Sequence, residues 1–205
     1  MNDSQFTKDT HPFKSLIPEN AKKLIIGTIP PHRFCESSEV LYDEDVRFYY
    51  GSCDNEFWCL IGEIFSITFL RNNSLEAIRQ REEFLLRQKM GITDIISTCR
   101  RENNSASDNM LKDIEYLNIK SLLSQHSSID TLLYTSLFVK KCMNTYLGTY
   151  HSINPINRSL QYVRINGKQY TVRILYSPSP QALRGIGKNG SIIRKEQYEK
   201  VFRSE

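Results

Sequence analysis

The segment FYYGSCDNEFW, residues 48–58, contains residue types that could do chemistry on a flat, polar substrate. Phe48, Tyr49 and Tyr50 are three consecutive aromatic residues, whereas aromatic residues in a core usually alternate with aliphatic ones. Tyr50 could stack against a planar ligand, and the other two are expected to pack in the core. Asn55 carries an amide that both donates and accepts hydrogen bonds, so it could orient a water molecule. It could equally cap the helix after it.

The composition is typical of a globular protein. The 205 residues are 40% hydrophobic and carry a formal net charge of +4. This length predicts a single domain, 1–205, with 1–11 as a loosely ordered N-terminal segment. No apolar run reaches the roughly eighteen residues of a membrane span, and the polar start lacks the apolar stretch of a signal peptide. The sequence therefore predicts a cytoplasmic monomer that does not contact a membrane.

The cysteines do not form a recognisable framework. They are odd in number, scattered and without a C-x-x-C pair: Cys35, Cys53, Cys59, Cys99 and Cys142. This pattern argues against a set of disulfides and against a cysteine-bound zinc or iron–sulfur site. We expect neither a metal nor a cofactor.

A repeating pattern of strands and helices must hold the candidate residues in place. Short apolar runs predict strands at 23–28, 91–97, 130–135 and 171–177. Helical patterns lie between them, which predicts a three-layer α/β/α fold with a central four-stranded parallel sheet. Right-handed crossovers would order these strands 2-1-3-4.

The segments between and after the strands carry their own signals. Helices are predicted at 55–69, at 74–89 with Ser74 as the N-cap, at about 110–125, at 137–147 and at about 191–203. Residues 99–109, CRRENNSASDN, predict an exposed polar loop. Asn166-Gly167 lies between two alternating runs and predicts a hairpin. Its first arm, 160–165, could add an antiparallel edge strand.

Ligands bind beyond the carboxyl ends of the strands in such a sheet. The first strand leads into GTIPPHRF and the last into SPSPQALRG, and the prolines in both segments fix the backbone amides in place. The continuation LRGIGKNGSIIRK is glycine-rich and basic, with Arg184, Lys188, Arg194 and Lys195. A basic loop that enters a helix suits a phosphate backbone. A surface loop that is basic by chance fits the sequence equally well.

Four segments together resemble one family. LIIGTIPPH and LYSPSPQALRG resemble the Gly-x-x-Pro turn and the x-Pro-Ser-Pro loop of the uracil-DNA glycosylase superfamily. FYYGSCDNEFW and GITDIISTCRREN are similar to segments of its hypoxanthine-DNA glycosylase and mismatch-specific branches. The resemblance spans residues 12–203 and keeps the order and spacing of all four segments.

The resemblance implies a DNA glycosylase that acts on DNA containing a damaged or mismatched base. Such an enzyme flips a deaminated base, hypoxanthine or uracil, into a pocket and hydrolyses the N-glycosidic bond, leaving an abasic site. It implies a base-binding set of Gly27, Thr28, Ile29, Pro30 and Tyr50, with Asn55 as the catalytic residue. It also implies a DNA-binding set of Ser177, Ser179, Leu183, Arg184 and Lys188, in which Leu183 would fill the emptied base stack.

The sequence departs from the family pattern at two positions. Ile29 stands where several branches carry a water-activating Asp or Asn, and Ser177 stands where others carry a His. Asn55 is then the residue left to do the chemistry. Asp94 could be a second acid, but a structural pairing with Arg100 or Arg101 is favoured. Two further functions therefore remain open: a catalytically silent relative that binds nucleic acid or a nucleobase, and a hydrolase of small nucleoside-like compounds.

Overall fold

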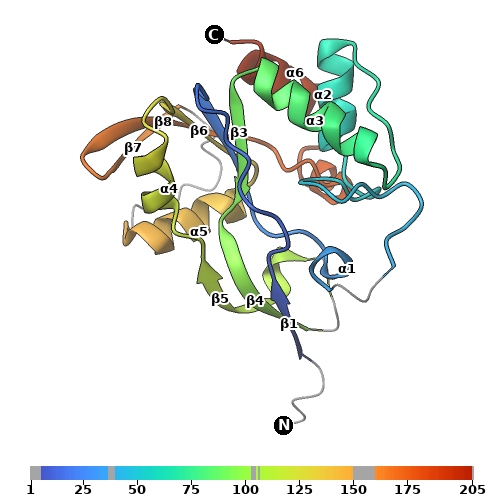
Figure 1. Ribbon diagram of the computed structural model, residues 1–205, viewed down its shortest axis with the longest axis horizontal. Helices are drawn as coiled ribbons and strands as arrows, with labels where there is room; N and C mark the ends of the chain where they lie inside the picture. Colours follow the sequence, from blue (N-terminus) through green and yellow to red (C-terminus); the bar gives the residue numbers. More distant parts are fainter. Residues whose placement is uncertain (1–5, 37–39, 103–104, 106, 150–159, 205) are drawn as a thin grey trace.

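A five-stranded sheet forms the middle of three layers in the computed structural model, which describes residues 6–36, 40–102, 105, 107–149 and 160–204 (Figure 1). Its strands lie in the order β3 (Met90–Asp94), β2 (Lys23–Gly27), β6 (Thr131–Tyr134), β8 (Lys168–Ile174) and β7 (Gln161–Ile165). The first four are parallel and correspond to the four predicted strands, in the predicted order. β7 pairs antiparallel with β8, so the sheet has one strand more than the four predicted.

The extra strand is the first arm of the hairpin that Asn166-Gly167 predicts. Both turn residues adopt positive φ angles, 50° and 81°. A two-residue turn of this kind matches the right-handed twist of the two strands it joins. The hairpin prediction is confirmed, and β7 takes the edge of the sheet.

Helices cover both faces of the sheet. α2 (Phe57–Phe65), α3 (Leu75–Arg87) and α6 (Gly190–Phe202) lie on one face, and α4 (Ile119–Gln125) and α5 (Leu137–Leu147) lie on the other (Figure 1). Successive side chains of a strand point to opposite faces of the sheet. Ile25 therefore packs in the hydrophobic cluster under α2, α3 and α6, whereas Leu24 and Ile26 pack in the cluster under α4 and α5. The Ser74 cap is also confirmed, because its hydroxyl accepts a hydrogen bond from the Ala77 N–H. No helix in the described parts of the chain is long and apolar enough to cross a membrane.

A second, antiparallel sheet corrects three predictions. Its strands lie in the order β1 (Phe6–Thr10), β4 (Ile96–Glu102) and β5 (Leu111–Tyr116). Part of the segment predicted as loose, 1–11, is therefore a strand, and residues 1–5 lie outside the described residues. The loop predicted at 99–109 begins as a strand and continues into the 3₁₀ turn η2 (Asp108–Met110). The helix predicted at 110–125 is a strand followed by the short α4.

Buried charge explains why sequence patterns missed this sheet. Asp9 of β1 and Arg101 of β4 are each 1% exposed, so the inner face of the sheet carries an ion pair beside the apolar Cys99 and Leu111. The Asp9 carboxylate also hydrogen-bonds with Nδ1 of His32 at 2.5 Å. Nη2 of Arg101 donates to the carbonyl of Pro30 at 2.6 Å. The sheet thus supports the turn after β2.

Replacing Asp9 with alanine should lower the free energy of unfolding by about 3–5 kcal/mol, because it leaves the Arg101 guanidinium buried without its counter-ion. Equilibrium unfolding in urea measures this loss. The matched control is Glu83→Ala, which removes an exposed pair with Arg87 and should cost no more than about 0.5 kcal/mol. Equal losses in the two variants would contradict a structural role for the buried pair.

Candidate active site

The carboxyl ends of β3, β2 and β6 lie side by side at one edge of the central sheet. Gly27 ends β2, Asp94 ends β3 and Thr135 comes directly after β6. A Cβ atom added at Gly27 would lie 2.1 Å from Oδ1 of Asp94 and 2.4 Å from the hydroxyl oxygen of Tyr50. Only glycine therefore allows the carboxylate and the phenol to approach the end of β2 so closely.

Tyr50 is held firmly in this cluster. The hydroxyl of Thr135 donates to the Ile26 carbonyl and accepts a hydrogen bond from the Tyr50 hydroxyl at 2.9 Å. Phe57 stacks on one face of the Tyr50 ring, with the ring centroids 4.4 Å apart. Burial, together with the nearby Asp94, raises the pKa of Tyr50 well above its ordinary value, so the phenol stays protonated. The backbone of Tyr50 has φ of +55°, a strained conformation that is often kept at functional sites.

Asp94 has a different partner from those expected. Its Oδ2 lies 2.8 Å from Nε2 of His11, the residue directly after β1. Arg101 pairs with Asp9 instead, and Arg100 pairs with Asp113. The prediction that Asp94 pairs with an arginine was therefore wrong. His11 was not singled out by the sequence, because its role depends on a strand that the sequence does not predict.

Asp108 joins the cluster from η2. Its half-buried side chain lies near Thr28, Arg101 and Asp94. Burial raises the pKa of Asp108 to about 6, and the negative charge of Asp94 adds to this rise, while Thr28 and Arg101 oppose it. The sequence placed Asp108 in an exposed polar loop, and nothing in its local pattern distinguished it from its polar neighbours.

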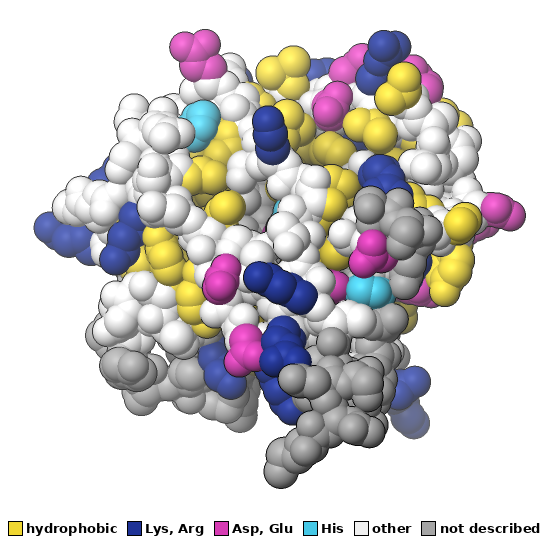
Figure 2. All heavy atoms as spheres, turned by 60° about the horizontal axis from the view of Figure 1, so that its bottom comes forward, with side chains coloured by type: hydrophobic (Ala, Val, Ile, Leu, Met, Phe, Trp, Pro, Cys, Tyr) yellow, Lys and Arg dark blue, Asp and Glu magenta, His cyan; other side chains and the backbone are white. Residues whose placement is uncertain are grey.

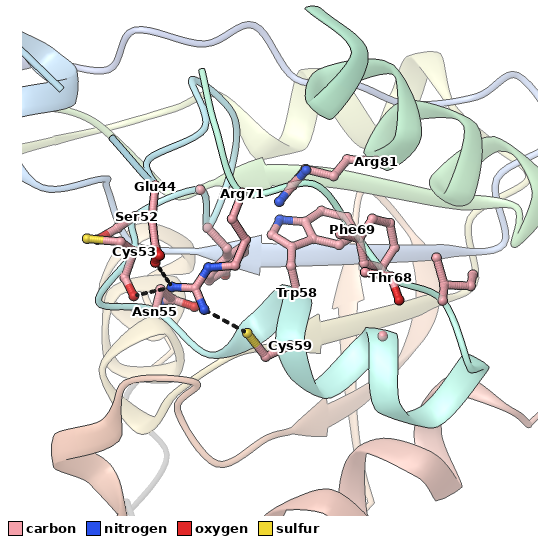
Figure 3. Close-up of a pocket in the computed structure, with 14 residues that line it drawn as sticks. Glu44, Ser52, Cys53, Asn55, Trp58, Cys59, Thr68, Phe69, Arg71 and Arg81 are labelled. Atoms are coloured by element: carbon pink, nitrogen blue, oxygen red, sulfur yellow. Dashed lines mark hydrogen bonds and ion pairs between the residues drawn. The ribbon is translucent and has the colours of Figure 1, made fainter. Parts of the chain in front are cut away.

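Asn55 lies at the start of α2, on the border of a cavity of about 240 Å³ (Figure 3). Its Oδ1 accepts a hydrogen bond from the Phe57 N–H at 2.9 Å. This is the only hydrogen bond that the Asn55 side chain makes to the described residues. Tyr50 borders the same cavity, so two of the predicted site residues lie side by side around one space.

Two arginines give this cavity a positive lining. Arg71 lies over it and pairs with the exposed Glu44 at 2.7 Å (Figure 3). Arg81 is buried against the Trp58 and Phe69 rings, and among the described residues no carboxylate pairs with it. Burial lowers the pKa of Arg81 to about 10, which leaves it charged at neutral pH. Neither arginine was predicted as a site residue.

The loop that carries Tyr50 and Asn55 is fixed by Asp45. Both oxygens of this buried carboxylate accept hydrogen bonds from Arg33, at 2.7 and 3.0 Å. The backbone N–H groups of Cys53 and Tyr42 donate to it at 2.8 and 2.9 Å. Burial acts to raise the pKa of Asp45, but the hydrogen bonds from Arg33 and the two amides outweigh it and lower the pKa below its ordinary value.

The loop predicted to bind DNA packs beside this one. The Glu56 N–H donates to the Pro178 carbonyl at 3.0 Å. Nη1 of Arg194 donates to the carbonyls of Ser177 and Ser179, and Nη2 pairs with the Glu56 carboxylate. Arg194 is 2% exposed, so it holds two loops together and is not part of a basic rim. The sequence-based interpretation of this residue was wrong.

The other basic residues of this segment have separate environments. Lys195 pairs with Glu63 at 2.8 Å. Arg184 and Lys188 are exposed around η3 (Pro180–Gly185), where a phosphate could reach them. Leu183 is half-buried and lies close to Gly190 at the start of α6. On the face drawn in Figure 2, Lys and Arg side chains lie among Asp and Glu and do not form one continuous basic patch.

The structure thus brings together Gly27, Thr28 and Tyr50, with Asn55 beside them. The side chain of Ile29 is 9% exposed and packs in the core, which leaves only its backbone for contact with a ligand. No group of three or more His, Cys, Asp or Glu side chains suited to a metal occurs within the described ranges.

Comparisons with known proteins identify what this arrangement resembles. No family model matches the chain. A hypoxanthine DNA glycosylase of Methanosarcina barkeri is 29% identical over 126 residues, which are 60% of this chain and 68% of that protein. The solution structure of a candidate uracil DNA glycosylase from Methanosarcina acetivorans superposes with a TM-score of 0.62 and 19% identity. The match covers 96% of this chain and 98% of that one. The fold is shared, and the resemblance to the uracil-DNA glycosylase superfamily is confirmed.

Asp45→Asn should lower the free energy of unfolding by about 2 kcal/mol near pH 7, because hydrogen bonds to a charged acceptor are lost. Since the pKa of Asp45 is lower in the folded than in the unfolded protein, its contribution is present above pH 3.8 and is lost as the pH falls further. Urea unfolding at several pH values should show the wild type and the variant converging below about pH 4. A difference that stays constant with pH would show that Asp45 acts without its charge.

Proposed function

We propose that this protein is a monofunctional DNA glycosylase that excises a deaminated base, hypoxanthine or uracil, from DNA. The observation that carries the proposal is the position of Tyr50, which lies against Gly27 at the carboxyl edge of the sheet and borders one cavity with Asn55. The similar proteins named as hypoxanthine and uracil DNA glycosylases support the same reaction class. DNA is then the partner, and hydrolysis leaves an abasic site.

Tyr50 would provide the surface on which the flipped base stacks. Phe57 covers one face of its ring, and among the described residues no aromatic ring covers the other. The strained backbone and the hydrogen bond to Thr135 fix the ring in one orientation. A platform that is already ordered loses little entropy when the base binds, which favours binding.

Asn55 would orient the attacking water. The hydrogen bond from Phe57 to Oδ1 fixes the amide, while Nδ2 and the second lone pair of Oδ1 remain for water, base or sugar. The N-cap of α2 is Glu56, and Asn55, the residue before it, accepts from the first N–H of the helix; this contact is compatible with a catalytic role. An amide is not a strong base, so its contribution comes from positioning and from stabilising charge on the departing base.

The segment from Ser177 to Lys188 would contact the DNA backbone. Arg194 and Pro178 fasten its first part to the loop that carries Asn55, so a phosphate held there has a fixed relation to the reaction centre. Arg184 and Lys188 are exposed to receive phosphates, and Leu183 would enter the base stack.

A second candidate function is a catalytically silent relative that binds DNA or a nucleobase. The burial of Ile29 in the core favours it, because the turn after β2 then offers no side chain to activate water. An assay decides between the two. Purified protein is incubated with duplexes that contain uracil, hypoxanthine, xanthine or a mismatch, and abasic sites are detected by alkaline strand cleavage. Binding without cleavage for every duplex would favour the silent relative.

Asn55→Ala should reduce the single-turnover excision rate on the order of a hundredfold, as the loss of one positioned catalytic group typically does. The protein should remain folded, because the lost cap costs only about 1 kcal/mol. Asn73→Ala is the matched control, since its amide contacts the backbone of Arg47 at an exposed site. Unchanged excision with a lower melting temperature would make Asn55 a cap and nothing more.

Arg184→Ala and Lys188→Ala should each weaken binding to duplexes of any sequence and reduce the slope of log affinity against log salt by about one unit. Fluorescence anisotropy at several salt concentrations measures both quantities. Arg87→Ala is the control, because Arg87 ends α3 near the amino ends of the parallel strands. If all three variants keep the wild-type slope, the phosphates bind elsewhere.

A further inference from the structure

The cavity that Asn55 and Tyr50 border carries more positive than negative charge. Arg71 lies over it and Arg81 is buried in its wall, and Glu44 is the one carboxylate among the described residues that line it (Figure 3). We propose that this cavity binds a phosphate group, and that in a complex with DNA this phosphate belongs to the backbone beside the flipped nucleotide. The assignment to DNA rests on the proposed glycosylase function, whereas the phosphate site does not depend on it.

Arg81 supplies a buried charge that pairs with no carboxylate of the described residues, and it is 2% exposed. Nη1 donates to the Ala77 carbonyl at 2.6 Å and Nη2 to the Leu70 carbonyl at 3.0 Å, while Nε has no hydrogen-bond partner in the described part of the chain. The aromatic rings of Trp58 and Phe69 have their centroids 5.3 and 5.5 Å from the guanidinium carbon, and they offset only part of the cost of burying this charge. An anion in the cavity would offset more of this cost by attracting the guanidinium group.

Arg71 is placed to make the direct contact with the phosphate. It is exposed over the cavity, where its Nη2 pairs with Glu44 at 2.7 Å and donates to the Cys53 carbonyl at 3.4 Å. Glu44 is itself exposed, and an exposed pair of this kind contributes little to stability, so a phosphate can displace Glu44 at small cost. The planar guanidinium group can then bind two phosphate oxygens at once, in the bidentate geometry that it also uses with carboxylates.

The remaining lining suits a phosphate better than a neutral base. The first turn of α2 borders the cavity through Trp58 and Cys59, and the start of a helix carries a partial positive charge. Ser52, Thr68 and Asn55 add polar side chains, and the volume of about 240 Å³ is several times what one water molecule needs. A neutral base would leave the two guanidinium charges uncompensated, whereas a phosphate carries negative charge and several acceptor oxygens.

A phosphate in this cavity would lie next to the proposed reaction centre. Asn55 borders the cavity, and its neighbour Glu56 binds the Ser177–Lys188 segment through the Pro178 carbonyl. Two separate phosphate contacts therefore meet at the start of α2. A flipped nucleotide leaves the duplex together with its flanking phosphates, so two such contacts can hold the sugar beside Asn55.

The first test needs no catalysis. Trp58 is the single tryptophan of the chain and lines the cavity, so its fluorescence can report whether the cavity is occupied. Inorganic phosphate, titrated at constant ionic strength against sodium chloride, should change the emission until it saturates. Arg71→Ala should weaken this binding on the order of tenfold, because a charge-assisted contact is lost. The control Arg79→Ala changes an exposed arginine of α3 outside the described lining of the cavity, and it should match the wild type.

Arg81 is tested by two variants that separate its charge from its packing. Arg81→Gln removes the charge and should also weaken phosphate binding on the order of tenfold, whereas Arg81→Lys keeps the charge and should recover part of the loss. Urea unfolding shows whether each variant is folded, and if Arg81→Gln does not fold, the exposed Arg71 still provides the same test. Lower stability of both variants with unchanged phosphate affinity would overturn the part of Arg81 in the site.

A second experiment identifies the source of the phosphate. Duplex DNA with an uncleavable analogue of an abasic site is bound at several salt concentrations and followed by fluorescence anisotropy. If a DNA phosphate occupies the cavity, Arg71→Ala should reduce the slope of log affinity against log salt by about one unit, and inorganic phosphate should compete with the duplex. An unchanged slope without competition would overturn the assignment to DNA and leave a site for free phosphate.

The outcomes separate this site from the proposed function. A phosphate response that survives in both Arg71→Ala and Arg81→Gln overturns the site, and so does a wild type that shows neither a phosphate response nor a change of salt slope in Arg71→Ala. Excision of a base would leave the glycosylase function standing in either case. A wild type that binds phosphate through Arg71 and cleaves none of the duplexes keeps the site and overturns the glycosylase function.

Discussion

The buried ion pair between Asp9 and Arg101 is the interaction on which the rest of the site depends. Taking two charges out of water is costly, and the pair persists because each member also binds the backbone or side chains of the site. Arg101 uses its remaining donors on the carbonyls of Pro30 and Ser105. A hydrophobic pair could fill the same space, but it could not fix the turn after β2 and the segment before η2 at the same time.

Two further arginine–carboxylate pairs hold loops in place around the site. Arg33 binds Asp45 and so shapes the loop that carries Tyr50 and Asn55. Arg194 binds Glu56 and the carbonyls of Ser177 and Ser179, and so joins that loop to the one after β8. In each case a guanidinium group with several donors in one plane binds acceptors in a loop that lies outside the helices and strands. The sheet positions the ends of the strands, and the arginines position the loops beyond those ends.

The part of the fold that apolar burial dictates could be predicted from the sequence. β2, β3 and β6 are short apolar runs because both faces of the central sheet are covered, and the Asn166-Gly167 turn needs positive φ angles. Gly27, Tyr50 and Asn55 were found because they lie at strand or helix ends in a recognisable order. The second sheet could not be found, because an ion pair interrupts the apolar side chains on its buried face.

Residues whose role depends on distant partners were also missed or misread. Asp108, His11 and Arg101 look like ordinary surface residues until β1 and β4 pair. Arg194 was misread for the opposite reason: Arg184 and Lys188, earlier in the same basic segment, are exposed, and only the burial of Arg194 against Glu56 shows that it serves the interior. A local sequence pattern predicts secondary structure and exposure, whereas the roles of these residues depend on contacts with segments that are distant in the sequence.

The place of Arg194 on the last helix has a consequence for the order of assembly during synthesis. The strands β2, β3 and β6 can pair once the first two-thirds of the chain have left the ribosome, and the loop with Tyr50 can already lie against them. The group that joins this loop to the one after β8 arrives only with α6. In the growing chain, β2, β3 and β6 can therefore pair before the loop with Tyr50 is joined to the loop after β8.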